Sequence, residues 1–434
     1  MPPISFREAV IVWWRIGLLS FGGPAGQIAL MHRIIVEEKG WLDEARFLHA
    51  LNYCMLLPGP EAQQLATYIG WLLHGVRGGL VAGLLFILPG AAAILALSWL
   101  YVLLGNLTLV EGLFFGLKAA VLAIVVQALL RIAARTLQGP LKPALAVIAF
   151  LALFAFNLPF PLVIIGAGFV GYLGARFLPT IPDTLTAADL AVTVRPGTRF
   201  AALACLLLWA GTVGGLYAVL GAENVFAQLS GFFSKMAVIT FGGAYAVLAY
   251  VAQQGVEHYQ WLQPGEMLNG LAMAETTPGP LILVTQFVGF LAGLRESSTQ
   301  PSLLAATAGA LLTLWVTFLP CFLWIFAGAP YVEKLRGNRA LAAALAAITA
   351  AVVGVIANLA LWFALNALFT EQHRFTGYGL DLLLPRLPSV NLPLLAISLI
   401  AFTLAFVLKM RMLPLLGACA AMGMGWTLLV ASIG

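Results

Sequence analysis

Long apolar runs, separated by short segments rich in Gly, Pro and charged residues, dominate the pattern along this chain. Five runs reach the ~20 residues that a helix needs to cross a bilayer; they are residues 78–104, 109–133, 200–220, 302–328 and 340–368. Shorter apolar pieces, such as 24–36, 44–57 and 60–74, lie beside Gly and Pro. Such pieces are typical of half-helices or re-entrant hairpins. The pattern predicts an all-α polytopic membrane protein with broken or re-entrant helices.

The breaks in these helices occur twice along the chain. Phe-Gly-Gly, Trp-Leu and Pro-Gly-Pro stand at residues 21–23, 41–42 and 58–60, and each recurs 220 positions later. A constant offset over three motifs indicates an internal duplication. We expect a first repeat at residues 1–177, a linker with a connecting transmembrane helix at 178–223, and a second repeat at 224–434. Residues 370–390 are rich in polar residues, Gly and Pro, and we expect them to form a second long loop.

The distribution of basic residues predicts how the repeats lie in the membrane. Lys and Arg collect in cytoplasmic loops. The turn near residue 105 is uncharged, whereas its second-half equivalent, residues 330–339, carries Lys334, Arg336 and Arg339. Equivalent loops then lie on opposite sides, so we expect inverted-topology repeats in the inner (plasma) membrane. Residues 200–220 would supply the extra crossing that reverses the second repeat.

Composition agrees with a membrane protein and narrows the function. The chain is 62% hydrophobic and 9% charged, against roughly 25% charged residues in soluble domains. The net charge of +5 follows from the basic loops, and nothing suggests a nucleic-acid partner. Four scattered cysteines indicate buried structural residues, and no spacing suggests a metal or another cofactor. No GxSxG, HExxH or P-loop is present, so the sequence predicts neither an enzyme of these classes nor ATP drive.

The Gly and Pro breaks themselves are the candidate binding site. Gly permits positive φ and close backbone approach, and Pro suits the first position of a new helix. A helix N-terminus presents free N–H groups and a positive dipole end, which together bind anions without a cationic side chain. The alternative is that these positions are kinks or tight packing points. The candidate substrate-binding residues are Gly22, Gly23, Pro24, Gly59, Pro60, Gly242, Gly243, Gly279 and Pro280.

Charged residues within apolar segments extend this list, because they are costly and mark functional sites in membranes. Lys118 lies inside the 109–133 run, and Arg15 and Lys235 occupy equivalent positions ahead of the two Phe-Gly-Gly turns. Lys118 either neutralises a bound anion, extends to the interface or pairs with a carbonyl. For Arg15 and Lys235 we expect a role at the substrate or at a helix end. Glu61 follows the first Pro-Gly-Pro and Glu275 precedes the second. Both carboxylates are candidates for proton coupling, with helix capping as the alternative for Glu61.

Together these motifs resemble the chromate ion transporter family in its long, two-domain form. The match rests on Phe-Gly-Gly-Pro at 21–24, Gly-Trp-Leu at 40–42, Leu-Pro-Gly-Pro at 57–60, Phe-Gly-Gly-Ala at 241–244 and Thr-Pro-Gly-Pro at 277–280. It covers essentially the whole chain. The resemblance implies membrane transport of chromate, typically export that confers chromate resistance, with sulfate as a competing substrate.

The charge of chromate favours one direction of transport. A potential that is negative inside favours the exit of a dianion by about 4.6 kcal/mol at ~100 mV, so we expect efflux driven by the membrane potential. The alternative is proton- or cation-coupled transport of sulfate or another oxyanion. An intramembrane enzyme acting on lipid and a scaffold subunit are further alternatives, although no nucleophile–base pair supports the enzyme. The sequence leaves open whether copies form a homo-oligomer.

Overall fold

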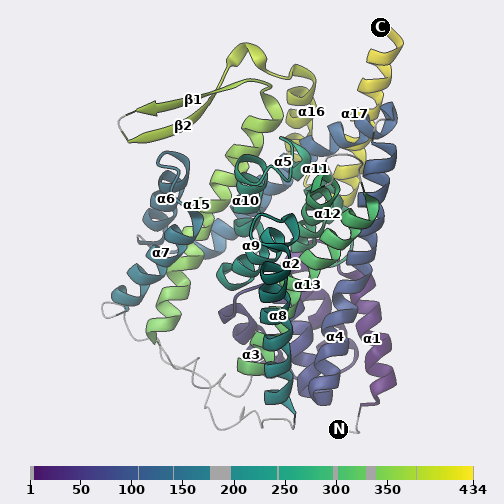
Figure 1. Cartoon of the computed structure of the whole chain (residues 1–434), viewed down its shortest axis with the longest axis vertical. Helices are drawn as coiled ribbons and strands as arrows, with labels where there is room; N and C mark the ends of the chain where they lie inside the picture. Colours follow the sequence, from purple (N-terminus) through teal and green to yellow (C-terminus); the bar gives the residue numbers. More distant parts are fainter. Residues whose placement is uncertain are drawn as a thin grey trace. The chain divides into compact units, whose positions relative to one another are not determined.

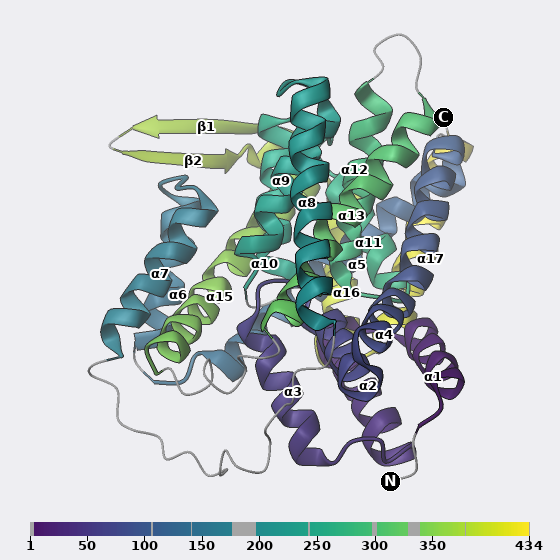
Figure 2. The same cartoon turned by 60° about the horizontal axis from the view of Figure 1, so that its bottom comes forward.

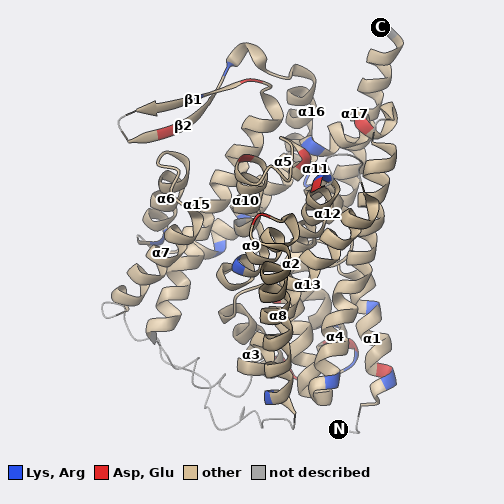
Figure 3. Ribbon diagram, viewed as in Figure 1, with Lys and Arg blue, Asp and Glu red and all other residues tan. Residues whose placement is uncertain are grey.

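The computed structural model describes residues 4–105, 107–139, 141–175, 197–241, 244–296, 302–328, 339–377 and 379–433. Nearly all regular structure in this part of the chain is helical (Figure 1). Within the described residues, six helices are long and apolar enough to cross a membrane. They are α4 (Glu61–Leu104), α5 (Thr108–Thr136), α8 (Thr198–Leu220), α13 (Leu303–Gly328), α15 (Arg339–Leu368) and α17 (Met412–Ile433). The prediction of an all-α polytopic membrane protein is confirmed, and long stretches of these ribbons carry no charge (Figure 3).

The helices pack into two compact units, and each unit draws on both halves of the sequence. Unit 1 consists of Met1–Ile94, Gly168–Ala244 and Thr277–Ala346. Unit 2 consists of Leu95–Ala167, Tyr245–Thr276 and Ala347–Gly434. A repeat of the sequence is therefore not a separate folded body. The first part of the predicted linker, residues 178–196, lies outside the described residues.

Short helices recur in the same order in the two halves. The first half has α1 (Phe6–Leu19), α2 (Gly23–His32) and α3 (Glu44–Leu56), and the second has α9 (Val225–Ile239), α10 (Ala244–Gln253) and α11 (Glu266–Thr276). The longest of them, α9, has 15 residues. A helix of that length spans about 22 Å, less than the hydrocarbon thickness of a bilayer. The predicted broken helices are confirmed.

The local backbone repeats as well. A π-helical turn continues α2 at η1 (Arg33–Glu38) and α10 at η3 (Gln254–His258). Gly40 and Gln260 follow at equivalent positions, and both have positive φ, 59° and 56°. A glutamine thus makes, in the second half, the turn that a glycine makes in the first. This conformation is uncommon for glutamine, so the duplicated fold imposes it.

The long element α4 is two helices that fold back on each other. His74 and Gly75 leave the helical conformation, with Gly75 at φ 64° and ψ −152°. A Cβ built on Gly70 would lie 2.4 Å from the carbonyl oxygen of Gly78. Residues eight positions apart in one straight helix would be about 12 Å apart. The pieces before and after this turn therefore pack together, and the turn separates the apolar runs 60–74 and 78–104.

The second half builds the same hairpin from α12 (Val284–Glu296) and α13. Gly289 approaches Gly309 and Thr313, and Gly293 approaches Ala305. As the residue number increases along α12, the number of the contacting residue on α13 decreases, so the two helices are antiparallel. Glycine at these contacts lets the backbones approach closely, which is common between membrane helices.

The second part of α4 and its equivalent α13 lie side by side in unit 1 and run in opposite directions. The ring of Phe326 lies 3.1 Å from the position of a Cβ on Gly79, and the ring of Phe322 lies 2.5 Å from that on Gly83. The contact partner on α13 thus moves back by four residues when the position on α4 moves forward by four. Two equivalent spans are antiparallel.

Unit 2 packs the remaining helices around α5 and α15. Gly112 and Gly116 of α5 contact Gly423 and Cys419 of α17, and α5 also packs against α16 (Leu392–Phe402). Around α15, Ala351 is buried with alanines of α6 (Leu141–Phe154) and α7 (Phe160–Gly174), and both views show these three helices side by side (Figures 1 and 2). Each long helix of unit 2 therefore packs against the closing helices of the other repeat.

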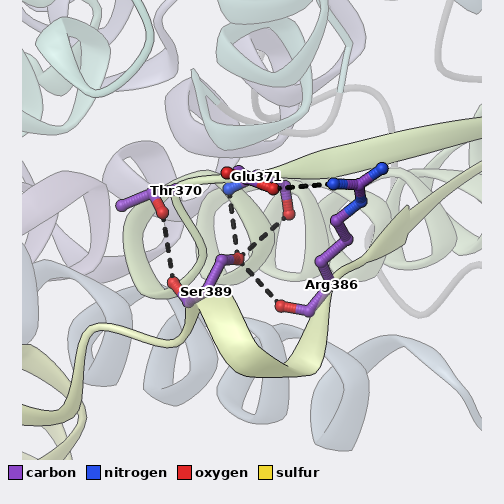
Figure 4. A network of polar contacts seen from close by, with 4 residues as sticks. All are labelled: Thr370, Glu371, Arg386 and Ser389. Carbon is purple, nitrogen blue, oxygen red and sulfur yellow. Dashed lines mark hydrogen bonds and ion pairs between the residues drawn. The ribbon is translucent and has the colours of Figure 1, made fainter.

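A β-hairpin follows α15, where the sequence predicts a loop at residues 370–390. Strands β1 (Gln372–Gly377) and β2 (Leu380–Pro385) pair in antiparallel fashion. At the base, Ser389 Oγ donates to the carbonyl oxygens of Glu371 and Arg386, and Arg386 donates to the Glu371 carboxylate at 3.0 Å (Figure 4). The loop prediction is wrong because this network and strand pairing satisfy the polar backbone.

Candidate functional site

The start of α2 is an open, uncapped helix N-terminus in unit 1. Gly22 and Gly23 have φ of 89° and 70°, and Pro24 occupies the first turn. No side chain caps this end, and a Cβ on either glycine would have no neighbour within 4 Å. Unlike a packed kink, this end has room beside it and N–H groups without helical partners. Their equivalents Gly242 and Gly243 lie outside the described residues.

The first Pro-Gly-Pro forms a tight turn between α3 and α4. Gly59 has φ of 120°, a conformation that side chains disfavour. A Cβ there would lie 2.9 Å from Nε2 of Gln64 and 3.1 Å from Sγ of Cys321. Pro60 precedes Glu61, the first residue of α4. The turn is thus enclosed by side chains of both halves.

The second Pro-Gly-Pro makes the equivalent turn before α12. Gly279 has φ of 96°, and a Cβ on Gly279 would lie 3.5 Å from Cα of Gly90. Pro280 leads into the short 3₁₀ helix η4 (Leu281–Leu283). Gly90 and Cys321 follow Pro89 and Pro320 at equivalent positions of α4 and α13. Each turn therefore lies against the proline-containing span of the other half.

Two main-chain hydrogen bonds join the halves at these turns. The amide of Gly59 donates to the carbonyl oxygen of Thr240 at 2.8 Å, and the amide of Gly279 donates to that of Ser20 at 2.8 Å. Ser20 and Thr240 are equivalent residues, and both hydroxyls donate to the carbonyl four residues earlier. We call these two bonds the crossing. Each half donates one of these bonds to the other half, as two copies related by a two-fold axis would. The bonds place the end of α1 beside the second turn and the end of α9 beside the first.

Gln27 is the side chain that reinforces one arm of the crossing. Its Nε2 donates to the carbonyl oxygens of Gly279 at 2.6 Å and Ser20 at 3.3 Å. The equivalent residue is Val247, so the other arm has no such support. Sequence reasoning missed Gln27, Ser20 and Thr240. The hydroxyl shared by both copies was a usable signal, whereas the role of Gln27 depends on a contact 252 residues away.

Buried amides line the same region. Gln64 donates from Nε2 to the carbonyl oxygen of Pro58, and Gln63 donates to the hydroxyl of Thr67. The side-chain oxygens of Gln27, Gln63 and Gln64 are buried without a hydrogen-bond partner. Buried polar atoms normally have one. These oxygens are acceptors, so they pair with hydrogen-bond donors and not with the oxygens of an anion.

The candidate cations of unit 1 do not lie within the crossing contacts. The guanidinium of Arg15 pairs with Glu38 at 3.0 Å, and both side chains are exposed. Lys235 is an exposed residue of α9. The backbone and amide groups, rather than these cations, are what the structure gathers at the turns.

The other charged candidates divide between the units. Lys118, in unit 2, has its Nζ 3.2 Å from the position of a Cβ on Gly265 and interacts electrostatically with Glu266. Glu275, also in unit 2, is 5% exposed and accepts a hydrogen bond from the hydroxyl of Tyr245 at 2.5 Å. Glu61 is partly exposed in the first turn of α4, where the helix dipole stabilises a carboxylate.

The start of α2 in unit 1 therefore offers main-chain donors that no side chain caps. Free N–H groups at the start of α2, beside a crossing of two broken helices, suit a ligand rich in acceptor oxygens. Interrupted helices at matching places of two repeats form the binding sites of many secondary transporters.

Comparison with known proteins agrees with this geometry. The profile of the family described as chromate transporter matches residues 7–172 and 227–424, which together exceed half of the chain. The chain belongs to the chromate transporter family. Both copies of the broken-helix motifs fall within the matched ranges, so the resemblance drawn from those motifs is confirmed. No solved structure matches this chain.

Relatives in this family carry the same description. A chromate transport protein of Pseudomonas aeruginosa is 32% identical over 82% of this chain and 80% of its own length. A chromate transport protein of Cupriavidus metallidurans is 28% identical over 82% of each chain. A probable chromate transport protein of Synechococcus elongatus is 27% identical over 82% of this chain and 84% of its own. The family is one of transport proteins, in agreement with the absence of an enzymatic motif from the sequence.

Proposed function

We propose that this protein exports chromate across the inner (plasma) membrane, driven by the membrane potential, and thereby confers chromate resistance. The observation that carries the proposal is the crossing. It holds two broken helices beside the start of α2, a helix N-terminus that no side chain caps. Family membership and the names of the relatives supply the substrate. Chromate is a tetrahedral dianion that accepts hydrogen bonds on all its oxygens.

The direction follows from charge. A potential of ~100 mV, negative inside, favours outward movement of two negative charges by about 4.6 kcal/mol, which is roughly a thousandfold gradient. Uptake would work against the same potential and would need more than two co-transported cations. Amide dipoles support release as well as binding, because they attract the anion without the tight ion pair that Lys or Arg would form.

The proposed binding residues are those of the two sets of breaks, with basic residues that neutralise the dianion as it passes. The proposal includes Gly22, Gly23, Pro24, Gly59, Pro60, Gly242, Gly243, Gly279, Pro280, Lys118, Arg15 and Lys235. It also includes an inverted arrangement of the repeats. The antiparallel contact of α4 with α13 supports that arrangement, because equivalent spans that run in opposite directions enter the membrane from opposite sides.

Flux in proteoliposomes tests the proposal. Purified protein is reconstituted with chromate inside, and a potassium gradient with valinomycin sets the potential. We expect chromate to leave when the inside is negative and to be retained when the potential is reversed. Chromate flux that ignores the potential, or no flux under any gradient, would contradict the proposal. Competition by sulfate and molybdate in the same vesicles separates chromate transport from general oxyanion transport.

A further inference from the structure

Glu275 is a buried carboxyl group with one close partner. It lies at the end of α11, is 5% exposed, and accepts a hydrogen bond of 2.5 Å from the hydroxyl of Tyr245 on α10. Ionisable groups inside membrane proteins are costly and mark ion or proton pathways. The distance is typical of a hydroxyl that donates to a charged oxygen. The contact between Glu275 and Tyr245 is therefore a specific polar interaction and not only a packing contact.

The surroundings do not fix the charge of Glu275. Among the described residues, no salt bridge holds the carboxyl group. The groups that act on it are Tyr245 from α10 and, through its charge, Arg131 from α5. The helix α17, which also packs against α11, carries no Asp, Glu, Lys, Arg or His. A direct salt bridge would hold the carboxylate ionised, whereas a hydroxyl leaves both protonation states accessible.

Tyrosine suits both states because its hydroxyl donates and accepts. When Glu275 is ionised, the Tyr245 hydroxyl donates to it. When Glu275 is protonated, its own O–H can donate to the phenolic oxygen. In either state one hydrogen bond joins the two groups, which lowers the free-energy cost of burying them. A proton can bind and leave here while the hydrogen bond persists.

The pair exists in one repeat only. The positions equivalent to Tyr245 and Glu275 are Ala25 and Met55. A device needed to hold the duplicated fold together would be expected in both halves, as the crossing is. The replacement of both partners by apolar residues indicates an added function in the second half.

We propose that Glu275 and Tyr245 form a proton-binding site, and that one proton moves with each chromate. The inference rests on the proposed function of chromate export. The proton is taken from water on the loading side by the Glu275 carboxylate and is released to water on the other side, which restores the carboxylate. The transported pair then carries one negative charge, and the membrane potential still drives it outward with half the force on the free dianion.

The position of Glu275 in the chain links the proton to the anion. Glu275 and Gly279 are four positions apart in the chain, so their Cα atoms lie at most about 14 Å apart. A dianion at the second turn disfavours a second negative charge within that distance. Anion binding thus raises the proton affinity of Glu275, and release of the anion lowers it.

Stoichiometry measured in proteoliposomes tests the site. With the potential clamped at zero, we expect a tenfold proton gradient to sustain a tenfold chromate gradient, with chromate accumulating on the alkaline side. When the pH is equal on both sides of the membrane, the reversal potential should correspond to the movement of one net negative charge with each chromate. The variant Glu275→Gln should lose the response to the pH gradient and carry two charges per chromate. Tyr245→Phe should also lose the pH response, because the carboxyl group keeps its proton when it has no donor.

Matched controls exclude general effects of substitution and of chromate protonation in solution. Glu257→Gln removes an exposed carboxylate of η3, and Tyr250→Phe removes a hydroxyl of α10; both should keep wild-type stoichiometry. If the wild-type protein carries two charges per chromate and does not respond to the pH gradient, the inference of a proton-binding site is overturned. Potential-driven export would still hold. Persistence of the pH response in Glu275→Gln overturns the assignment to this residue. Absence of flux at every potential would instead contradict chromate export itself.

Discussion

The amide nitrogen of Gly59 lies 2.8 Å from the carbonyl oxygen of Thr240, and the equivalent amide of Gly279 lies 2.8 Å from the equivalent oxygen of Ser20. Each bond joins the Pro-Gly-Pro turn of one half to the residue before Phe-Gly-Gly of the other. Neither half satisfies its own turn, so the crossing requires both. This exchange explains why unit 1 combines segments from the two repeats.

Replacement of Gly59 by alanine should strongly reduce chromate efflux. The φ of 120° strains any residue with a Cβ, at a cost of about 1–3 kcal/mol. The new methyl would also press on Gln64 and Cys321. We expect Gly59→Ala to lower chromate efflux at least tenfold while the protein still reaches the membrane. Efflux assays in cells, normalised to protein in the membrane fraction, measure this.

The matched control for that variant is Gly214→Ala. Gly214 lies within α8, lacks a positive φ, and has no atom within 4 Å of a built Cβ. Efflux should remain within twofold of wild type. Equal efflux in Gly59→Ala and Gly214→Ala would show that the turn is not part of the transport site.

Removal of the Gln27 amide should destabilise one arm of the crossing. Gln27→Leu loses the 2.6 Å bond to the carbonyl oxygen of Gly279, and a buried hydrogen bond contributes about 1 kcal/mol. We expect a lower melting temperature in detergent and weaker stabilisation by chromate. Gln228→Leu, which loses an exposed bond of 3.3 Å, is the control. Identical melting of the two variants would contradict a structural role for Gln27.

Much of this architecture could be predicted from the sequence, because it depends on local chemistry. The turn at His74 and Gly75 separates two apolar runs, and the positive φ of Gly22, Gly59 and Gly279 follows from glycine placed between helix ends. The crossing could not be predicted, since its hydrogen bonds use main-chain atoms that every residue has. The β-hairpin was missed because Leu380–Pro385 lacks the alternation of a strand.

Reporter tags should find the ends of α4 and α13 on opposite sides of the membrane. The two spans are antiparallel in unit 1, so a tag after Gly105 and a tag after Gly328 should be separated by the bilayer. Paired alkaline phosphatase and fluorescent protein fusions report the two sides. Fusions that place both tags on the same side would refute the inverted repeats.

The β-hairpin should lose stability when Asp381 is neutralised. Hydrogen bonds and charge from Arg374 lower the pKa of Asp381 below its usual value. The stabilisation is therefore present above pH ~4, the ordinary range of an aspartate, and is lost as pH falls toward the lower pKa of the folded state. At neutral pH, Asp381→Asn should reduce protection of hairpin amides up to about fivefold, as expected for an exposed ion pair.

The control for that variant is the wild type in acid. Below the lowered pKa of Asp381, the difference in protection between the wild type and Asp381→Asn should shrink, because both side chains are then uncharged. A difference that stays constant between pH 7 and strong acid would mean that the ion pair with Arg374 does not stabilise the hairpin.

Hydrogen exchange with and without chromate tests the amide-lined site most directly. The protein in nanodiscs is exchanged and digested, and peptides that cover residues 21–31 and 56–66 are compared with a peptide from the hairpin. Chromate should slow exchange in the first turns of α2 and α4 and leave the hairpin unchanged. If exchange in all three peptides is the same with and without saturating chromate, the anion does not bind at these helix ends.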